Sequence, residues 1–524
     1  MMKKIRTVLC TLIAVLLCLP LATACGREKI LDSEGNEVTD PSKIIEISVW
    51  DSGLGTKFLY NLVDAFKAQN KGIGVTVTPS SSQDTFYNTI SAGARANSFD
   101  LYFTYGPKFR QYFEGQHKDK NYLEDLTPVF RSTATGDTQT IESKFPEAMR
   151  ETLKVGDKYY AGLWQASANG LTYNAAEFAK HPEWKLPNTT KELQNLALAI
   201  AETGKTPFVH VPGYWEYVWA VWWAQYDGAT AHQDFWTKDF FEYFNAMYKA
   251  GNWNQSADYV TPGVKKALDA LYALVSPEGY TLNGSNTTDF SILQTQYLSG
   301  DAMMMATGGW LETEMAKNQS AGSQVSDKDI RFMKVPVLSS VVELLEIETD
   351  EELSAIVSYI DNGETGEKPA SDADIAKVRA MRNITYTSGP EMNVFIPAYA
   401  EGKEAAKEFL KFVYSDAGTK IYVDTTHVLP PWYAGDASAL DVSEWSVFSK
   451  SHLELQKSAN YIFKDFSHPI VYNTARANVF YDTPESKFTA AYANDRETVT
   501  AFLSREIGQL SKDWAVFLSA SGLK

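Results

Sequence analysis

Hydrophobic positions near the start of the foldable part of the chain follow first the period of a strand and then that of a helix. The predicted strands are residues 44–50 (IIEISVW), 75–78 and 101–104. After the first strand, four hydrophobic residues recur at the spacing that buries one face of a helix: Leu59, Leu62, Val63 and Phe66. A helical stretch around residues 84–96 precedes the third strand. This alternation predicts a parallel sheet covered on both faces, which binds ligands beyond the carboxyl ends of its strands.

The same alternation starts again in the middle of the chain. Strands are predicted at residues 171–173, 207–211 and 302–306. Thr189 and Glu192 form a capping box that begins a helix, and Gly204 ends it. A further helix is marked by four hydrophobic residues: Val264, Leu268, Leu271 and Val275. Trp219, Trp222 and Trp223 share one face of an apolar helix and are predicted to lie in the core. The sequence therefore predicts an α/β protein with two units.

A stretch late in the chain is unusually acidic. Between Glu343 and Arg382, eleven acidic residues stand against four basic ones. We expect residues 338–382 to form a solvated surface insertion, with a partner-docking element as the alternative. The α/β pattern then resumes with a strand at 392–396 and a helix at 403–414, and the remainder is predicted to be mostly helical.

The first 24 residues have the composition of an export signal. Three basic residues precede an apolar stretch at 8–19, and small residues lead up to Cys25. The stretch is shorter than a membrane-spanning helix needs. The residues before Cys25 resemble a bacterial lipobox, except that Ala22 stands where leucine is usual and Leu21 lies one position earlier. We expect residues 1–24 to be a signal peptide and Cys25 to be lipidated; the alternative is a plain signal peptide with Cys25 incidental.

Cleavage before Cys25 would change both the thiol content and the charge. The three cysteines are at positions 10, 18 and 25, so the mature chain would hold one thiol and no internal disulfide. The formal charge of −17 would become −20, because the removed residues carry three positive charges and no negative one. Residues 26–42 are polar and aperiodic, and 25–42 is predicted to be a tether that extends up to about 56 Å at roughly 3.3 Å per residue.

Composition narrows the function classes. With 524 residues, 44% hydrophobic and 22% charged, the chain is an ordinary globular protein that is too long for one core. The excess of acidic residues argues against a nucleic-acid binder. The seven histidines are scattered without metal-site spacing, and the glycines at 53 and 55 lack P-loop spacing. We therefore predict no metal, no cofactor, no catalytic residue and no enzyme activity.

Several segments, in order along the mature chain, resemble the extracellular solute-binding proteins of ABC importers, in the oligosaccharide-binding group that includes maltose-binding protein. They are ISVWDSGLGTKFLYNLVDAF, DLYFTYGPKF, YYAGLWQASANGLTYN, TTKELQNLALAI, QYLSGDAMMMATGGW and VFIPAYAEGKEAAKEFLKFVYSD. The fifth and sixth are the more specific. The acidic insertion and the greater length depart from the simplest members.

This resemblance implies a two-lobed periplasmic-binding-protein-like (type II) fold, in which each lobe is a mixed, mostly parallel sheet flanked by helices. The N-terminal lobe would comprise residues 43–165 and 390–425, and the C-terminal lobe residues 166–385 and 426–524. An oligosaccharide would bind between the lobes, which would close over it by a hinge. The implied partners are the transmembrane subunits of an ABC permease. The protein would be a monomer on the outer face of the bacterial cytoplasmic membrane, held there by the lipid on Cys25.

Flat aromatic rings bury the faces of a sugar, and polar side chains satisfy its hydroxyls. The predicted ligand-binding residues are Trp50, Asp51, Tyr105, Lys108, Trp164, Gln165, Tyr214, Trp215, Trp310, Glu312, Trp432 and Tyr433. The first four follow strand ends, where a parallel sheet presents its site. Trp164 and Gln165 lie where the chain of the family crosses between lobes.

The remaining candidates follow turns. Tyr214 and Trp215 come after a Pro-Gly pair, and Trp432 and Tyr433 after Pro-Pro. Trp310 follows Gly-Gly at a helix start, where the family often places a sugar platform. Glu312 would either accept sugar hydroxyls or favour the helix N-terminus. Two other functions stay open: a protein of the same fold that binds a peptide or polyamine, and an exported glycoside hydrolase.

Overall fold

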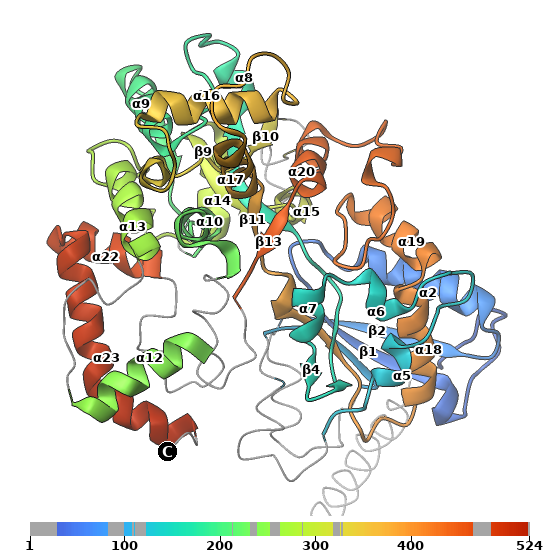
Figure 1. The fold of residues 1–524 in the computed structure, drawn as a ribbon. Coiled ribbons are helices and arrows are strands. Elements are labelled where there is room, and N and C mark those ends of the chain that lie inside the picture. The colour runs from blue at the N-terminus through green and yellow to red at the C-terminus, as the bar shows by residue number, and fades with distance from the viewer. Residues whose placement is uncertain are drawn as a thin grey trace, which may run out of the picture.

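The computed structural model describes residues 29–81, 99–106, 109, 122–211, 213–230, 238–251, 262–285, 287–317, 325, 328–464 and 484–521. The signal peptide, Cys25, the helical stretch predicted around 84–96 and Lys108 lie outside these residues. Two α/β bodies lie side by side, and the first is on the right in Figure 1. Each is built around its own sheet.

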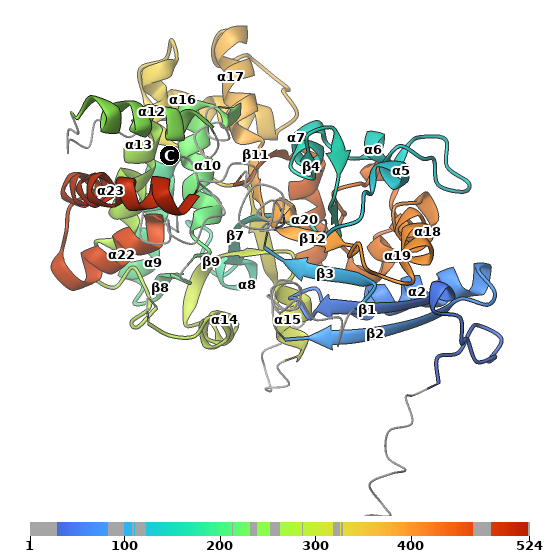
Figure 2. The same ribbon diagram turned by 90° about the horizontal axis from the view of Figure 1, so that it is seen from below.

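The first body contains a five-stranded sheet of order β2-β1-β3-β12-β6. Its strands are β1 (Ile44–Trp50), β2 (Gly74–Ser80), β3 (Leu101–Tyr105), β6 (Gly162–Leu163) and β12 (Met392–Phe395). β1 pairs in parallel with β2 and β3, whereas β12 is antiparallel to β3 and β6. The strands predicted from the hydrophobic pattern are all present. Strands that come from distant parts of the chain complete the sheet (Figure 2).

Helices α2 (Lys57–Gln69) and α18 (Lys403–Val413) pack on this sheet, and α19 (Asp416–Thr426) packs on these two helices. The buried face of α2 is the predicted stripe with Phe58 added. Shorter elements complete the body: α5 (Thr127–Phe130), α6 (Ile141–Lys144), α7 (Glu147–Glu151), β4 (Lys154–Val155) and β5 (Lys158–Tyr159). Lys144 is buried there and joins α6 to α19, since its Nζ lies 2.5 Å from Asp137 and 2.7 Å from Asp416.

The second body contains a six-stranded sheet of order β13-β11-β7-β9-β8, with β10 also paired to β7. Its strands are β7 (Ala168–Asn174), β8 (Thr206–Val209), β9 (Ala302–Gly308), β10 (Ile330–Met333), β11 (Ile384–Thr387) and β13 (Asn460–Ile462). Its helices are α8 (Ala175–Phe178), α9 (Thr190–Glu202), α10 (Glu216–Asp227), α12 (Lys238–Ala250), α13 (Pro262–Val275), α14 (Phe290–Ser299), α15 (Leu311–Lys317), α20 (Val447–Lys457), α22 (Pro484–Asp495) and α23 (Val499–Ser521).

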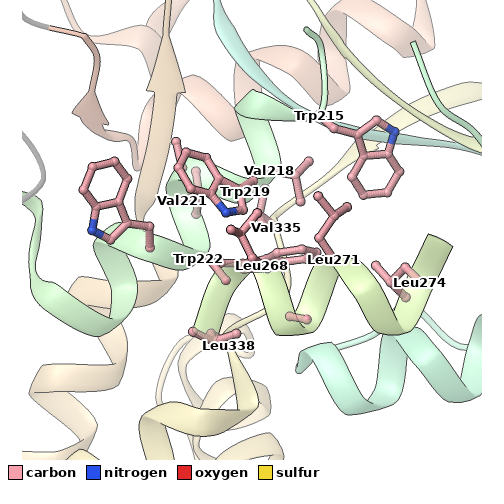
Figure 3. Close-up of a cluster of buried hydrophobic side chains, with 14 of the residues drawn as sticks. Trp215, Val218, Trp219, Val221, Trp222, Leu268, Leu271, Leu274, Val335 and Leu338 are labelled. Atoms are coloured by element: carbon pink, nitrogen blue, oxygen red, sulfur yellow. The ribbon is translucent and has the colours of Figure 1, made fainter. Parts of the chain in front are cut away.

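The core of the second body is built around α10, which packs against α13 (Figure 3). Trp219, Trp222 and Trp223 are almost completely buried there, which confirms that these tryptophans belong to the core. The indole N–H of Trp222 donates to the carbonyl of Pro336, and that of Trp223 to the carboxylate of Asp227. The apolar helix is hydrophobic all round because it is enclosed on every side.

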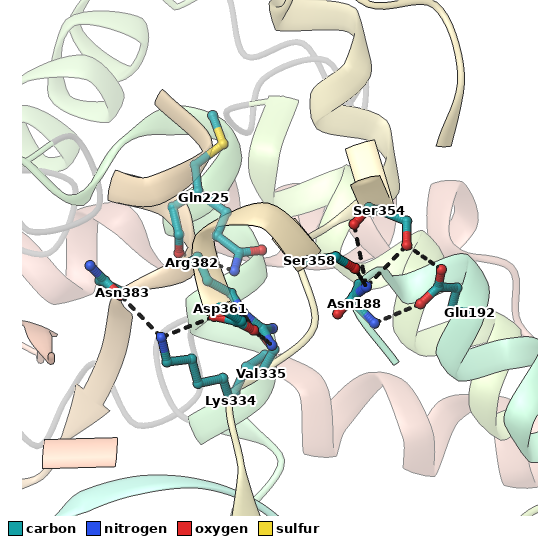
Figure 4. A network of polar contacts seen from close by, with 11 residues as sticks. Asn188, Glu192, Gln225, Lys334, Val335, Ser354, Ser358, Asp361, Arg382 and Asn383 are labelled. Atoms are coloured by element: carbon teal, nitrogen blue, oxygen red, sulfur yellow. Dashed lines mark hydrogen bonds and ion pairs between the residues drawn. The ribbon is translucent and has the colours of Figure 1, made fainter. Parts of the chain in front are cut away.

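The acidic segment 338–382 is more than a solvated insertion. It forms η5 (Ser339–Leu344), α16 (Asp350–Asp361) and α17 (Asp372–Arg382), and each helix buries an apolar face in the core of the second body. Asn188 Nδ2 donates to the hydroxyls of Ser354 and Ser358, and Arg382 is paired with Asp361 (Figure 4). The prediction of a solvated insertion was incomplete, because the many exposed carboxylates dominate the composition of this segment. They obscure the apolar residues that recur at helical spacing.

The described part of the predicted tether is folded. Ile30 and Val38 lie against Gly74 of β2, and Leu31 pairs with Glu37. The carboxylate of Asp32 accepts hydrogen bonds from the backbone of Glu34 and Asn36. The prediction that residues 25–42 form an extended tether is therefore wrong for residues 29–42, which carry too few apolar side chains to show a period but cover the edge of the sheet.

The α/β class with two sheets and interwoven chain segments is confirmed. Parallel pairs occur where strands and helices alternate, and antiparallel pairs occur at β7 and β12, which lie next to the crossings between sheets. The sheets therefore contain fewer parallel pairs than the alternation of strands and helices predicted. The reason is that a strand that returns from the other body runs in the opposite direction. Among the described helices, none is both long and apolar enough to span a membrane.

Candidate functional site

Within the residues that the structure describes, three chain segments connect the two bodies. The first joins β6 to β7, and the second joins β11 to β12. The third joins α19, which packs on α2 of the first body, to α20, which packs on β10 of the second. Strand ends and helix starts of both bodies therefore meet at these crossings.

Aromatic side chains of both bodies gather there, and we call this set the aromatic seam. It consists of Trp50, Tyr105, Tyr214, Tyr217, Trp310 and Tyr386. Ring centroids are 5.2 Å apart for Trp50 and Tyr105, 6.0 Å for Tyr217 and Trp310, 6.1 Å for Tyr214 and Trp310, and 5.3 Å for Tyr217 and Tyr386. Tyr214 and Tyr217 pack against the cores of both bodies. The seam offers flat apolar faces with hydroxyl groups at their edges.

Trp310 is held by glycines on both sides. It follows β9 in the second body, yet it packs with the core of the first body and is 8% exposed. A Cβ at Gly308 would lie 2.2 Å from its ring, and one at Gly53 of the first body would lie 2.8 Å from its Cβ. Any side chain at either position would displace the tryptophan, so the glycines allow the ring to lie between the bodies.

A buried polar network supports the turn that carries Trp310. The hydroxyl of Ser167 accepts the backbone N–H of Gly309 at 2.7 Å, and Nε2 of His452 on α20 lies 3.2 Å from the same hydroxyl and 2.9 Å from the carbonyl of Ala168. A Cβ at Gly309 would strike the ring of His452. Burial lowers the pKa of His452 to about 4, so the imidazole is neutral at pH 7.

Glu312 is occupied by α20. Its Oε2 accepts hydrogen bonds from the hydroxyls of Ser446 at 2.9 Å and Ser449 at 2.8 Å. The carboxylate therefore joins α15 to the start of α20. This contact between helices is distinct from both roles considered for Glu312, the binding of sugar hydroxyls and the stabilisation of its own helix N-terminus.

Gln165 and Asp51 lie near the seam in different settings. The hydroxyl of Ser52 donates to Oε1 of Gln165 at 2.8 Å, and both side chains are buried. Asp51 is exposed at the end of β1. Gln165 lies in the first crossing, and Asp51 lies next to the turn at Gly53. A ligand between the bodies would meet both side chains.

Three predicted ligand contacts lie in the cores instead. Trp164, Trp215 and Trp432 are each 1% exposed. The indole N–H of Trp164 donates to the carbonyl of Thr104, and that of Trp432 to the hydroxyl of Thr419. Trp215 lies in the core of the second body beside Phe208. These three side chains thus lie in the cores and apart from the seam, and their contact with a ligand stays a prediction.

Tyr433 also lies away from the seam. It packs in a small separate cluster with Trp445 and Val423. Pro431 and Trp432, which precede it, are buried, and Trp432 belongs to the core of the first body. No local pattern in the sequence indicates which way this turn faces.

Two seam residues were not anticipated. Tyr217 lies within the apolar run of α10, where every residue resembles a core residue. Tyr386 lies in a four-residue strand just before the second crossing. Burial raises the pKa of both phenols well above the usual value, so both are neutral at pH 7. The Tyr-Thr-Ser-Gly-Pro run after the acidic segment was the available signal for Tyr386.

The described residues contain no group of three or more His, Cys, Asp or Glu side chains placed to hold a metal ion. Two α/β bodies, three crossings and aromatic rings of both bodies between them define a two-lobed solute-binding fold of the type II periplasmic-binding-protein class. The chain belongs to the family of bacterial extracellular solute-binding proteins, which residues 52–420 match.

Solved structures show the same fold at low sequence identity. A chitin oligosaccharide binding protein is 17% identical, with a TM-score of 0.58, covering 92% of this chain and 100% of its own. An ABC substrate-binding protein from Listeria monocytogenes in complex with cycloalternan is 16% identical, with a TM-score of 0.55 and coverage of 90% and 99%. RafE in complex with raffinose is 15% identical, with a TM-score of 0.56 and coverage of 89% and 99%. No curated protein matches the chain by sequence.

Proposed function

We propose that this protein is the substrate-binding component of a carbohydrate ABC importer and that it captures an oligosaccharide between two lobes. The observation that carries the proposal is the aromatic seam, in which Trp310, Tyr214 and Tyr217 of the second body pack with the core cluster of the first body, against which Trp50 and Tyr105 also pack. A ligand that contacts rings of both lobes stabilises the closed form, whereas contact with one lobe alone would not shift the equilibrium.

The lobes of this proposal are the two bodies. The N-terminal lobe comprises residues 43–165 and 390–425, and the C-terminal lobe residues 166–385 and 426–524. The hinge is the set of three crossings. Strand membership supports this division, since β6 and β12 belong to the first sheet while β7 and β11 belong to the second.

Energetics support a sugar as the ligand. Half of a tryptophan ring buried on a pyranose removes about 75–125 Å² from water, or roughly 2–3 kcal/mol at ~25 cal/mol per Å². Two or three such platforms support micromolar binding, about −8 kcal/mol, after the cost of association. The ligands named for structural neighbours, raffinose, cycloalternan and chitin oligosaccharide, are all carbohydrates.

The binding residues of this proposal are Trp50, Asp51, Tyr105, Gln165, Tyr214 and Trp310, with Tyr217 and Tyr386 added. We place the mature protein outside the cell, attached to the membrane by acyl chains on Cys25 after removal of residues 1–24. The closed form delivers its sugar to the transmembrane subunits of a permease. The protein acts as a monomer, without a cofactor, and binds without turnover.

Calorimetric titration with raffinose, xylotriose and chitotriose, run beside a hydrolysis assay on the same sugars, tests this function. Binding at one site per chain without product supports it. Product release without stoichiometric binding would identify a glycoside hydrolase. Binding of peptides or polyamines in place of every sugar would identify a transporter component for another solute.

A further inference from the structure

A buried amide lies in the middle of the aromatic seam. Asn169 on β7 is 0% exposed, and neither Oδ1 nor Nδ2 has a hydrogen-bond partner within the part of the chain that the structure describes. A buried amide without partners opposes folding, so cores seldom retain one. Its position indicates a role other than stability.

The register of the sheet shows what surrounds this amide. Asn169 lies opposite Tyr386 of β11 on one side and Gly308 of β9 on the other. Residues directly opposite one another in antiparallel strands carry their side chains on the same face. The place of the missing side chain at Gly308 is taken by the six-membered ring of Trp310. Asn169 is therefore flanked by two aromatic rings of the seam.

Helix α10 covers the same face. Its Tyr217 contacts both flanking rings, with centroids 5.3 Å from Tyr386 and 6.0 Å from Trp310. The opposite face of β7 is different: a Cβ at Gly170 would meet Leu455 of α20. The amide of Asn169 thus lies beneath three aromatic rings on the side of the sheet that faces the seam, one residue beyond Ala168 at the first crossing.

We propose that Asn169 is a specificity-determining residue whose carboxamide binds two neighbouring hydroxyls of the sugar unit at Trp310. This rests on the proposed function. A carboxamide donates through Nδ2 and accepts at Oδ1, which matches a vicinal diol in which one hydroxyl accepts and the other donates. When the lobes separate, Gly53 withdraws from Trp310, and a sugar reaches the amide when the Trp310 ring, which belongs to the same body as Asn169, turns aside. The substrate class is a carbohydrate with a free vicinal diol at that unit.

The same sheet supplies a matched control. Thr307 is also fully buried, and its hydroxyl has no partner within the described residues. It lies opposite Gly170, so it shares the face covered by α20 rather than the seam. Thr307→Val and Asn169→Leu both replace an unpartnered polar group by an apolar one of similar size. Both should keep or raise the melting temperature.

The experiment is calorimetric titration of the full chain with raffinose, xylotriose and chitotriose. We expect Asn169→Leu and Asn169→Ala to lower the affinity for the tightest-binding of these probes roughly 10- to 100-fold, which is the effect of two lost hydrogen bonds. Thr307→Val should change the same affinity less than twofold. A deoxy analogue of that probe lacks one hydroxyl of the diol. It should bind the unmodified chain more weakly than the probe does, and it should bind Asn169→Leu with the same affinity as the probe.

The outcomes separate this inference from the function on which it rests. If the unmodified chain binds none of the probes, the proposed function fails. If it binds a sugar and both Asn169 variants bind that sugar equally well, the proposed function stands and the role of Asn169 is overturned. If both Asn169 variants fail to fold while Thr307→Val folds, Asn169 is a structural residue and the assignment is again overturned.

Discussion

Gly53 and Trp310 belong to different bodies, yet a Cβ on Gly53 would lie only 2.8 Å from the Cβ of Trp310. Real side-chain carbons do not approach so closely, so the contact exists only because residue 53 has no side chain. The contact therefore belongs to the arrangement in which the two bodies lie against each other, and a methyl group at this point would hold them apart.

We expect Gly53→Ala to weaken sugar binding roughly 10- to 100-fold, because overpacking of a close contact costs about 1–3 kcal/mol in the closed form. Small-angle scattering should show less compaction on addition of sugar. Gly170→Ala is the control, since its added methyl meets nothing nearer than 3.5 Å. Equal affinities for the two variants would mean that closure does not use the Gly53 contact.

Trp310→Ala should weaken sugar binding by about 2 kcal/mol or more, because a large flat contact surface is lost from the seam. Titration of the folded variant measures this effect. Trp432→Phe is the comparison: it removes the hydrogen bond to Thr419 from the core and should cost about 1 kcal/mol of stability while leaving affinity unchanged. If Trp432→Phe lowered the affinity for sugar while Trp310→Ala did not, Trp432 would be a binding residue and Trp310 would not.

The pKa of His452, lowered by burial to about 4 against a usual 6.5, predicts acid sensitivity. Between these pH values the unfolded chain binds a proton that the folded chain does not, so stability falls as pH falls from 6.5 to 4. The loss amounts to about 3 kcal/mol in all. Urea unfolding at pH 7, 6, 5 and 4 should show a shallower decline for His452→Gln; parallel curves would show that another group controls the acid response.

Lys144→Met should destabilise the first body by about 3–5 kcal/mol, because it leaves Asp137 buried without its cation. Urea unfolding measures the change. Replacing both partners, Lys144→Met with Asp137→Leu, should recover much of the loss, since no buried charge is then left unpaired and the carboxylate of Asp416 is exposed to solvent. A double variant as unstable as the single one would show that shape, and not charge, is decisive at this site.

Periodicity was sufficient to predict much of the fold. The stripe of α2, the strands β1, β3 and β9 and the tryptophan-rich core of α10 follow from spacing alone, because each buries a face fixed by its own sequence. The pairing of β12 with β3 places Met392 opposite Tyr105, and no local pattern encodes a pair so far apart in the sequence. The family resemblance supplied that information.

The direction in which a ring points was not predictable. Trp164, Trp215 and Trp310 all follow strand ends or turns, but only Trp310 has glycines that let its ring lie between the bodies. Trp164 and Trp215 turn inward to bury their faces among neighbours that the sequence does not identify. Tyr217 was missed for the converse reason, since a seam residue on an enclosed helix looks like any other core residue.

The folded turn at residues 29–42 changes how the protein would sit on a membrane. If the lipid is on Cys25, four Cα–Cα steps separate the anchor from Lys29, a span of at most about 14 Å. Since Ile30 is packed against β2, the anchor is attached close to one edge of the first sheet. The protein would then lie against the lipid headgroups with that edge always nearest to them, able to rotate about the anchor but not to drift away. Encounter with a permease would become a search in two dimensions by a molecule that already has a preferred orientation.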